Sequence, residues 1–134
     1  MESNWELKTT NNINQMLRLR SDKTIDEVIT TLPNLLIVKH QYHVADDIMF
    51  PDPSCLAFFT AFEQNHLSAL EFEGSLSLMA VDIFEGSYKF FIYCDDAQKC
   101  VYDCISFLKS NSLFKCDFEI VNNEKGERLK SLIS

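Results

Sequence analysis

Three of the five cysteines lie within eleven positions, at Cys94, Cys100 and Cys104, and thiols this close could bind a metal ion or exchange disulfides. The chain has no Cys-x-x-Cys pair, and its three histidines are too few to complete a zinc-finger pattern. Free cysteine is among the most frequently buried residue types, so we expect core packing, with no metal ion and no cofactor. Cys55 is the best candidate for a reactive thiol because it opens an expected helix, although the charge of Asp52 opposes its ionisation.

The histidines and the adjacent carboxylates do not form a recognisable catalytic pattern. His40 and His43 are three residues apart on an expected strand, so they point to opposite faces and cannot share a metal ion. His66 lies on the apolar stripe of an expected helix, where a hydrogen-bonded core histidine is the common case. The pairs Asp46–Asp47 and Asp95–Asp96 are typical of loops and helix caps. No nucleotide-binding, phosphate-binding or hydrolase motif is present, and we predict that the chain is not an enzyme.

From residue 34 onward the local patterns follow the order strand, helix, strand, strand, helix, strand. Asp52 followed by Pro53 predicts the start of the first of these helices, and Gly74 predicts its end. The expected strands span 13–20, 34–44, 75–84, 88–94 and 113–121, and the expected helices span 21–33, 53–72, 95–108 and 124–133. This order predicts an α+β, ferredoxin-like split βαβ fold (βαββαβ), with helices on one face of an antiparallel sheet and an N-terminal strand/helix extension.

We expect a single domain over residues 1–134. It comprises an N-terminal extension (1–33) packed on the βαββαβ core (34–121), and a C-terminal helix (124–134). The strand 75–84 is expected at a sheet edge, where it could pair with a partner strand; the oligomeric state is not predicted. No apolar run approaches the roughly 20 residues of a membrane span. The start, MESNWELK, is polar and acidic rather than a secretory signal, so we expect a cytoplasmic protein.

Charge is unevenly distributed along the chain. Residues 1–39 hold five acids and five bases, and residues 89–134 hold seven of each. The block 40–88 holds no Lys or Arg and eight acids, namely Asp46, Asp47, Asp52, Glu63, Glu71, Glu73, Asp82 and Glu85. A chain with a net charge of −8 is a poor candidate for binding nucleic acid directly, whereas a basic protein would be attracted to it. A solvated surface that only aids solubility is the competing interpretation.

The expected topology brings part of this acidic block to one end of the sheet. The loop after the first core strand and the hairpin around Gly86 should meet there, whereas Glu71 and Glu73 should lie at the opposite end. Aromatic residues often anchor protein interfaces, and two flank these acids. The predicted partner-binding surface consists of Asp46, Asp47, Phe50, Asp52, Asp82, Glu85 and Tyr88, with a core role as the alternative for Phe50.

Several positions resemble a bacterial family of ferredoxin-like domains. They are an early Trp, a Pro-x-Leu strand start, an aromatic-Glu pair in the long helix and a glycine hairpin before an aromatic strand, at Trp5, Pro33, Leu35, Phe62, Glu63, Gly86, Tyr88 and Tyr93. The chain is similar to the regulator of ribonuclease activity B and to the immunity proteins of contact-dependent growth inhibition. The latter resemblance implies a protein that neutralises a cognate basic toxin, expected to be a nuclease, by covering its substrate cleft. The former implies an acidic regulator of a housekeeping ribonuclease, and a small-molecule enzyme is a further alternative.

Overall fold

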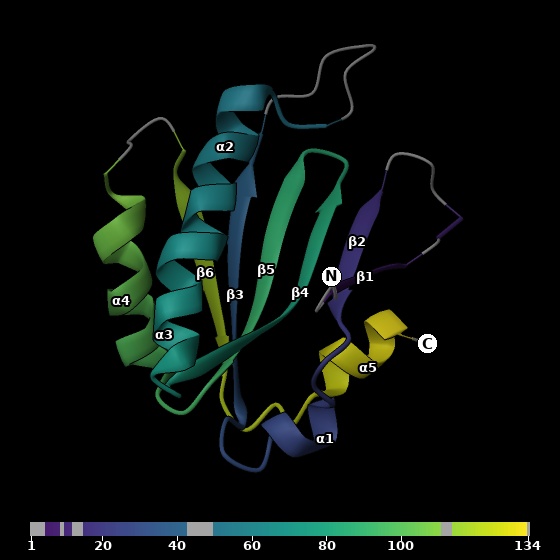
Figure 1. Cartoon of the computed structure of the whole chain (residues 1–134), viewed down its shortest axis with the longest axis vertical. Helices are drawn as coiled ribbons and strands as arrows, with labels where there is room; N and C mark the ends of the chain where they lie inside the picture. The colour runs from purple at the N-terminus through teal and green to yellow at the C-terminus, as the bar shows by residue number, and fades with distance from the viewer. Residues whose placement is uncertain (1–4, 9, 12–14, 43–49, 111–113, 134) are drawn as a thin grey trace.

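A six-stranded antiparallel sheet forms the centre of the computed structural model, which describes residues 5–8, 10–11, 15–42, 50–110 and 114–133. The strands are β1 (Trp5–Lys8), β2 (Met16–Arg20), β3 (Asn34–Gln41), β4 (Leu76–Phe84), β5 (Ser87–Cys94) and β6 (Cys116–Val121). Their order across the sheet is β1-β2-β4-β5-β3-β6 (Figure 1). The predicted α+β class is therefore confirmed, while β1 is a strand that the local sequence pattern did not predict.

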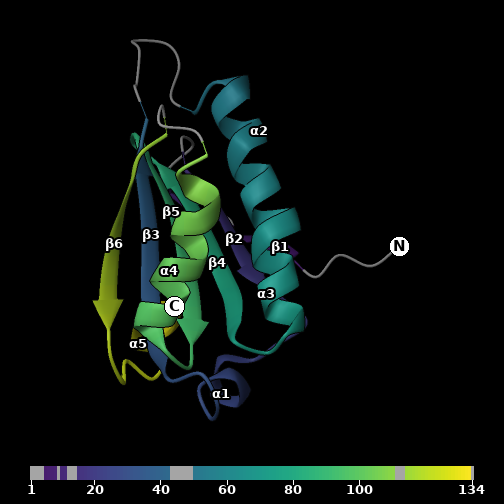
Figure 2. The same cartoon turned by 90° about the vertical axis from the view of Figure 1, so that its left-hand side faces the viewer.

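Helices cover both faces of the sheet. One face carries α2 (Pro53–Ala61), a π-helical segment (Phe62–Leu67) and α3 (Ser68–Phe72), which follow one another directly, and α4 (Ala97–Leu108) (Figure 2). The short helices α1 (Ile25–Val28) and α5 (Glu127–Ile133) pack against the other face. The prediction that all helices share one face is wrong for these two. Both faces of the central strands are apolar, and each needs cover from water.

The two long helical stretches begin and end where capping chemistry predicts. Asp52 Oδ1 accepts a hydrogen bond of 2.9 Å from the Cys55 N–H and caps α2. Asp96 caps α4 in the same way, with the Lys99 N–H as donor at 3.1 Å. Gly74 ends the first stretch with a φ of 89°, a left-handed conformation that glycine adopts at little cost.

The side chains of the central strands alternate between two cores. Residues of one parity, such as Phe90 of β5, face α2–α4 and meet a cluster of aromatic rings that includes Phe59 and Phe62. Strand residues on the other face meet α1 and α5 in a smaller core, made of Val28, Leu32, Leu35, Ile37, Met79, Ala80, Phe91, Tyr93 and Leu129. Because α1 and α5 are short, part of this second face stays open beyond the smaller core.

The N-terminal segment extends the sheet. β2 pairs with β4, with Leu17 opposite Asp82, and β1 pairs with β2 in turn. The prediction that the strand at 75–84 lies at an edge is therefore wrong, and in the described part of the chain the sheet ends with β1 and β6. The sequence predicted a strand at 13–20 but not its pairing with β4, because strand pairing joins segments that are far apart in the chain.

A buried carboxyl group attaches α5 to the sheet. Glu124, 7% exposed, accepts hydrogen bonds from Tyr93 Oη at 2.8 Å, the Gly126 N–H at 2.7 Å and the Arg128 N–H at 2.5 Å. Gly126 has a φ of 84°, and a Cβ at this position would overlap Ile25 Cγ1 of α1. These contacts hold α5 against α1 and the sheet, beside the open part of the second face (Figure 1).

Candidate functional site

The folded chain neutralises part of the acidic block with bases of β2 and of the segment that follows it. Arg18 donates two hydrogen bonds to Glu63, at 2.6 and 3.1 Å, in the two-pronged geometry typical of Arg–carboxylate pairs. Arg20 Nη1 lies 2.8 Å from Glu71 Oε1, and Lys23 Nζ lies 3.4 Å from Glu71 Oε2. These bases precede the block in the sequence, so the folded surface is less acidic than the local sequence indicates.

Arg20 is the centre of a structural ion-pair network. Its side chain is 7% exposed, and its Cζ lies 5.3 Å from the centre of the Trp5 ring. Burial by itself lowers the pKa of Arg20, but hydrogen bonds to Asp22 and Glu71 hold it above its ordinary value. Burial likewise raises the pKa of Glu71, but hydrogen bonds from Arg20 and the Leu78 N–H outweigh this effect and lower it. The network ties β1 and β2 to the helix layer.

The acids predicted to form one binding surface are divided between the two sides of the sheet. Asp52 lies in the helix layer, where its carboxyl group caps α2. Asp82 lies on the opposite face, directly across from Lys89, and accepts a hydrogen bond of 2.9 Å from Gln15 Nε2. Glu85 is exposed in the turn between β4 and β5. Asp52 and Glu85 share one end of the molecule, but Asp82 faces away from Asp52.

Neither predicted aromatic anchor is a free surface residue. Tyr88 is 2% exposed, and its ring lies 5.0 Å from Phe59 and 5.1 Å from Phe90. Burial raises the pKa of Tyr88 to about 12. The prediction of Tyr88 as a surface anchor is wrong, because strand alternation places it with Phe90 on the helix-covered face. Phe50 is half-buried against the larger core. The other two predicted positions, Asp46 and Asp47, lie outside the described residues.

The cysteines are packed in the core rather than arranged for chemistry. The buried ones are Cys55, Cys94, Cys100 and Cys104, and Cys116 is half-buried. Burial raises the pKa of Cys55 to about 11, and the charge of Asp52 acts in the same direction, so Cys55 fits the core role expected for the cysteines better than that of a reactive thiol. Among the described residues, no three or more His, Cys, Asp or Glu side chains are grouped to hold a metal ion.

Both described histidines use a ring nitrogen to donate a hydrogen bond to a backbone carbonyl. His40 Nδ1 lies 2.8 Å from the Lys115 carbonyl oxygen, and His66 Nε2 lies 2.5 Å from that of Asp103. His40 is 6% exposed and lies among the aromatic rings of the larger core. These contacts fit the core role predicted for His66.

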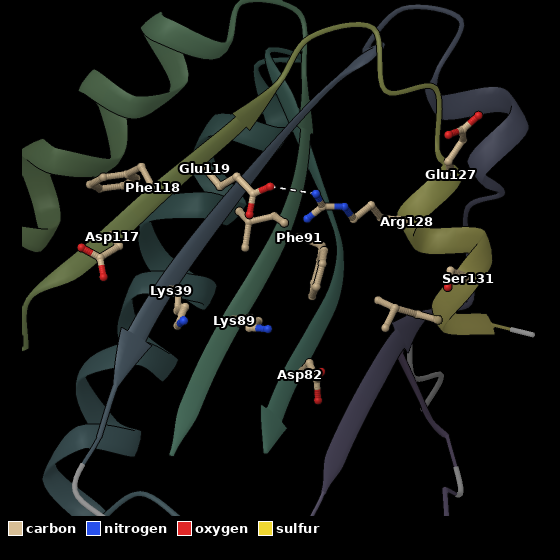
Figure 3. A pocket seen from close by; sticks show the side chains of 12 residues that line it. Lys39, Asp82, Lys89, Phe91, Asp117, Phe118, Glu119, Glu127, Arg128 and Ser131 are labelled. Carbon is tan, nitrogen blue, oxygen red and sulfur yellow. Dashed lines mark hydrogen bonds and ion pairs between the residues drawn. The ribbon is translucent and has the colours of Figure 1, made fainter. Parts of the chain in front are cut away.

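A groove of about 630 Å³ lies on the open part of the second sheet face, beside α5 (Figure 3). Lys39 of β3 and Lys89 of β5 are directly opposite each other and occupy its centre. Asp117 of β6 lies on the outer side of Lys39, and Asp82 of β4 lies on the outer side of Lys89. One row of side chains across four strands therefore carries the charge order minus, plus, plus, minus.

The part of the groove next to α5 is apolar. Its floor includes Ile37 and Phe91, each 5% exposed, and Leu132 of α5 contributes to its wall. Arg128 Nη2 donates a hydrogen bond of 2.8 Å to Glu119 Oε2 and joins α5 to β6 along one side (Figure 3). The groove thus combines a cationic centre with an apolar floor.

The sequence analysis did not identify this groove, although a signal for it exists. Lys39 directly follows the apolar run Leu35–Val38 of β3, and Lys89 is the only acidic or basic residue of β5. A single lysine in a half-buried strand is usually a residue at the solvated rim. That the two lysines meet depends on the pairing of β3 with β5, which brings together residues from separate parts of the sequence.

Comparison with known proteins identifies a family but no function. The model of the "Family of unknown function (DUF695)" matches residues 3–131. No curated protein and no solved structure matches the chain. Within the described residues, none of the helices has the length and apolar character needed to cross a membrane.

Proposed function

The chain belongs to DUF695, a family of unknown function, and we propose that it is a non-catalytic binding protein that neutralises a basic protein toxin, expected to be a nuclease. The single observation that carries the proposal is the pair of exposed acids at one end of the sheet. Asp52 and Glu85 come from segments separated in the sequence, and neither forms an ion pair with any described residue. Both are available to the bases of a partner.

The connections at this end support a shared surface. The Tyr42 N–H donates a hydrogen bond of 2.8 Å to the Gly86 carbonyl, so the end of β3 is held against the hairpin that carries Glu85. Tyr42, which follows β3, therefore lies next to this hairpin, and the first turn of α2, which Asp52 caps, lies at the same end of the molecule (Figure 1). Acids grouped in this way attract a basic partner over long range and orient its approach.

The proposed mechanism is stoichiometric occlusion. The acidic end, defined here as Asp52 and Glu85 with the sequence-predicted Asp46 and Asp47, would pair with Lys and Arg side chains of the toxin's substrate cleft. Such interfaces commonly bury about 1,600 Å² in total and depend on a few anchors. Tyr88 has no part in this contact because it is buried, and Asp82 has none because it faces the other side of the sheet.

Two further parts of the proposal concern the fold and the absence of catalysis. The strand order β4-β5-β3-β6, with α2–α4 packed on one face of those strands, supports a ferredoxin-like split βαβ core within the larger sheet. The structural hydrogen bonds of His40 and His66 and the raised pKa of Cys55 support a protein that acts by binding.

The test is a capture experiment from the native host with matched charge variants of the tagged protein. Asp52→Asn with Glu85→Asn removes two charges and keeps the fold, because asparagine caps helices well and tolerates the positive φ of residue 85. Glu73→Gln with Asp95→Asn removes two exposed charges at the opposite end and is the control. Each captured protein is identified by mass spectrometry, and its binding is measured with purified proteins at low and moderate salt.

We expect the wild type and the control to capture one stoichiometric basic protein, which moderate salt releases. The Asp52→Asn, Glu85→Asn variant should associate about tenfold more slowly at low salt. Inhibition of a nuclease activity of that protein by the wild type would support the immunity function. Capture of a large housekeeping ribonuclease would favour the regulator alternative, and equal binding by all three proteins would refute the acidic end as the contact.

A further inference from the structure

We propose that the groove beside α5 binds a small organic anion that carries one acidic head group and an apolar body. This site lies on the face of the sheet opposite α2–α4 and does not depend on the acidic end or on a protein toxin (Figure 3). The head group would lie between Lys39 and Lys89, and the body would lie on Ile37 and Phe91 below α5.

The lysine pair carries the first part of the inference. Lys39 and Lys89 are direct cross-strand neighbours, and like charges in this position destabilise a sheet. Both side chains are half-buried, and neither makes a hydrogen bond or ion pair with a described residue. An anion between the two ammonium groups would remove their repulsion and would accept hydrogen bonds from both.

The apolar floor carries the second part. Ile37 and Phe91 occupy the next position along β3 and β5 on the same face, and they are register partners as the lysines are. Leu132 of α5 covers this side of the groove. A volume of about 630 Å³ lies within the range of about 300–1,000 Å³ that is typical of small-molecule sites. A ligand anchored at the lysines therefore has room for an apolar body against α5.

The acids at the two ends of the row restrict the charge of the ligand. Asp82 and Asp117 each lie one strand outside the lysine pair, and the four-residue row has no net charge. A polyanion would extend past the lysines and be repelled by both acids, whereas a single carboxylate or phosphate head would not. The Arg128–Glu119 pair adds no uncompensated charge at the side of the groove, whereas Glu127 at the start of α5 adds one further acid to its lining.

The experiment uses the whole chain and four ten-carbon probes: decanoate, decyl phosphate, decanol and decyltrimethylammonium. Binding is measured by isothermal titration calorimetry, and the site is located from NMR shifts of the Ile37 and Leu132 methyl groups. Lys39→Met with Lys89→Met removes both charges but keeps the aliphatic length of the side chains, and it also removes the cross-strand repulsion, so the variant should fold. Lys109→Met with Lys115→Met is the control, because these lysines flank an apolar hollow between α4 and β6.

We expect decanoate or decyl phosphate to bind and to shift the Ile37 and Leu132 methyl signals, and the tighter of the two identifies the head group. The Lys39→Met, Lys89→Met variant should bind that probe at least about tenfold more weakly, and the control should bind it like the wild type. Equal binding of decanol or decyltrimethylammonium would overturn the proposal. Unchanged affinity in the Lys39→Met, Lys89→Met variant, loss of binding in the control, or no binding of either anion would also overturn it.

Discussion

Removal of the Glu124 carboxyl group should release α5 from the sheet and lower the free energy of unfolding. This group is 7% exposed and accepts three hydrogen bonds, from Tyr93 Oη and from the N–H groups of Gly126 and Arg128. A net contribution of about 1 kcal/mol per hydrogen bond gives a cost of about 3 kcal/mol for Glu124→Ala. Because small domains have about 5–15 kcal/mol of stability, the variant should still fold.

A double-mutant cycle isolates one of these bonds. Tyr93→Phe removes only the hydroxyl group that donates to Glu124, and we expect a cost of about 1 kcal/mol. The same substitution in the Glu124→Ala background should cost less than about 0.5 kcal/mol, because its acceptor is already absent. Burial and the hydrogen bond to Glu124 both raise the pKa of Tyr93, as expected for a hydroxyl group that keeps its proton to donate this hydrogen bond.

The assay is urea denaturation followed by far-UV circular dichroism and by the fluorescence of the single tryptophan, Trp5. Glu127→Ala is the control, because this exposed residue begins the same helix and should cost no more than about 0.5 kcal/mol. A shift of the midpoint with an unchanged slope would report a change in stability alone. Additive costs for Tyr93→Phe and Glu124→Ala, or a cost for Glu124→Ala no larger than that of the control, would refute the reasoning.

Three further predictions concern backbone, charge and thiols. Gly126→Ala should lower the free energy of unfolding by about 3 kcal/mol in urea denaturation, because it adds a clash with α1 to the cost of positive φ. A Cβ at Gly74 would meet open space, so Gly74→Ala should cost only about 1 kcal/mol for the positive φ. Equal costs for the two variants would contradict the close contact between Gly126 and α1. The pKa of Glu71 is lowered in the folded chain, so its ionised carboxylate stabilises the fold above the ordinary value of 4.5, and this stabilisation is lost as pH falls. Glu71→Gln should therefore lose less unfolding free energy than the wild type as pH is lowered below 4.5; an unchanged slope of unfolding free energy against pH would contradict the pairing. Burial raises the pKa of Cys55 to about 11 and that of Cys116 to about 12. Thiols of the native protein should therefore react with Ellman's reagent at pH 8 about 100-fold more slowly than those of the unfolded protein. One rapidly reacting thiol in the native protein would contradict this prediction.

The elements of this protein follow from local chemistry, and most of them were predictable. The helical stretch that begins with α2 needs only the Asp52 side chain to accept an N–H of its first turn. Its end after α3 needs only a residue that adopts positive φ, which Gly74 supplies. The strands β3 to β6 show their apolar residues directly in the sequence. β1 was missed because four residues with mixed polarity carry little pattern, and pairing with β2 stabilises them as a strand.

The face of each strand was harder to predict than the strand itself. Tyr88 follows the acidic hairpin, and its position suggested a surface role. In β5 both parities are apolar, so alternation alone does not decide which residues face α2–α4 and which face α1 and α5. The face of each residue is set by how the two helix layers, α2–α4 and α1 with α5, pack on the sheet. This packing places Tyr88 in the larger core and Tyr93 in the smaller one.

The sequence by itself determined the α+β class, the ends of the long helices, the burial of the cysteines and the uneven distribution of charge. Only the tertiary structure decided how that charge is used. It pairs Glu63 with Arg18, separates Asp82 from Asp52, and sets Lys39 against Lys89. The physical reason is range: caps and alternation are contacts within a few residues, whereas ion pairs and sheet register join segments that only the folded chain brings together.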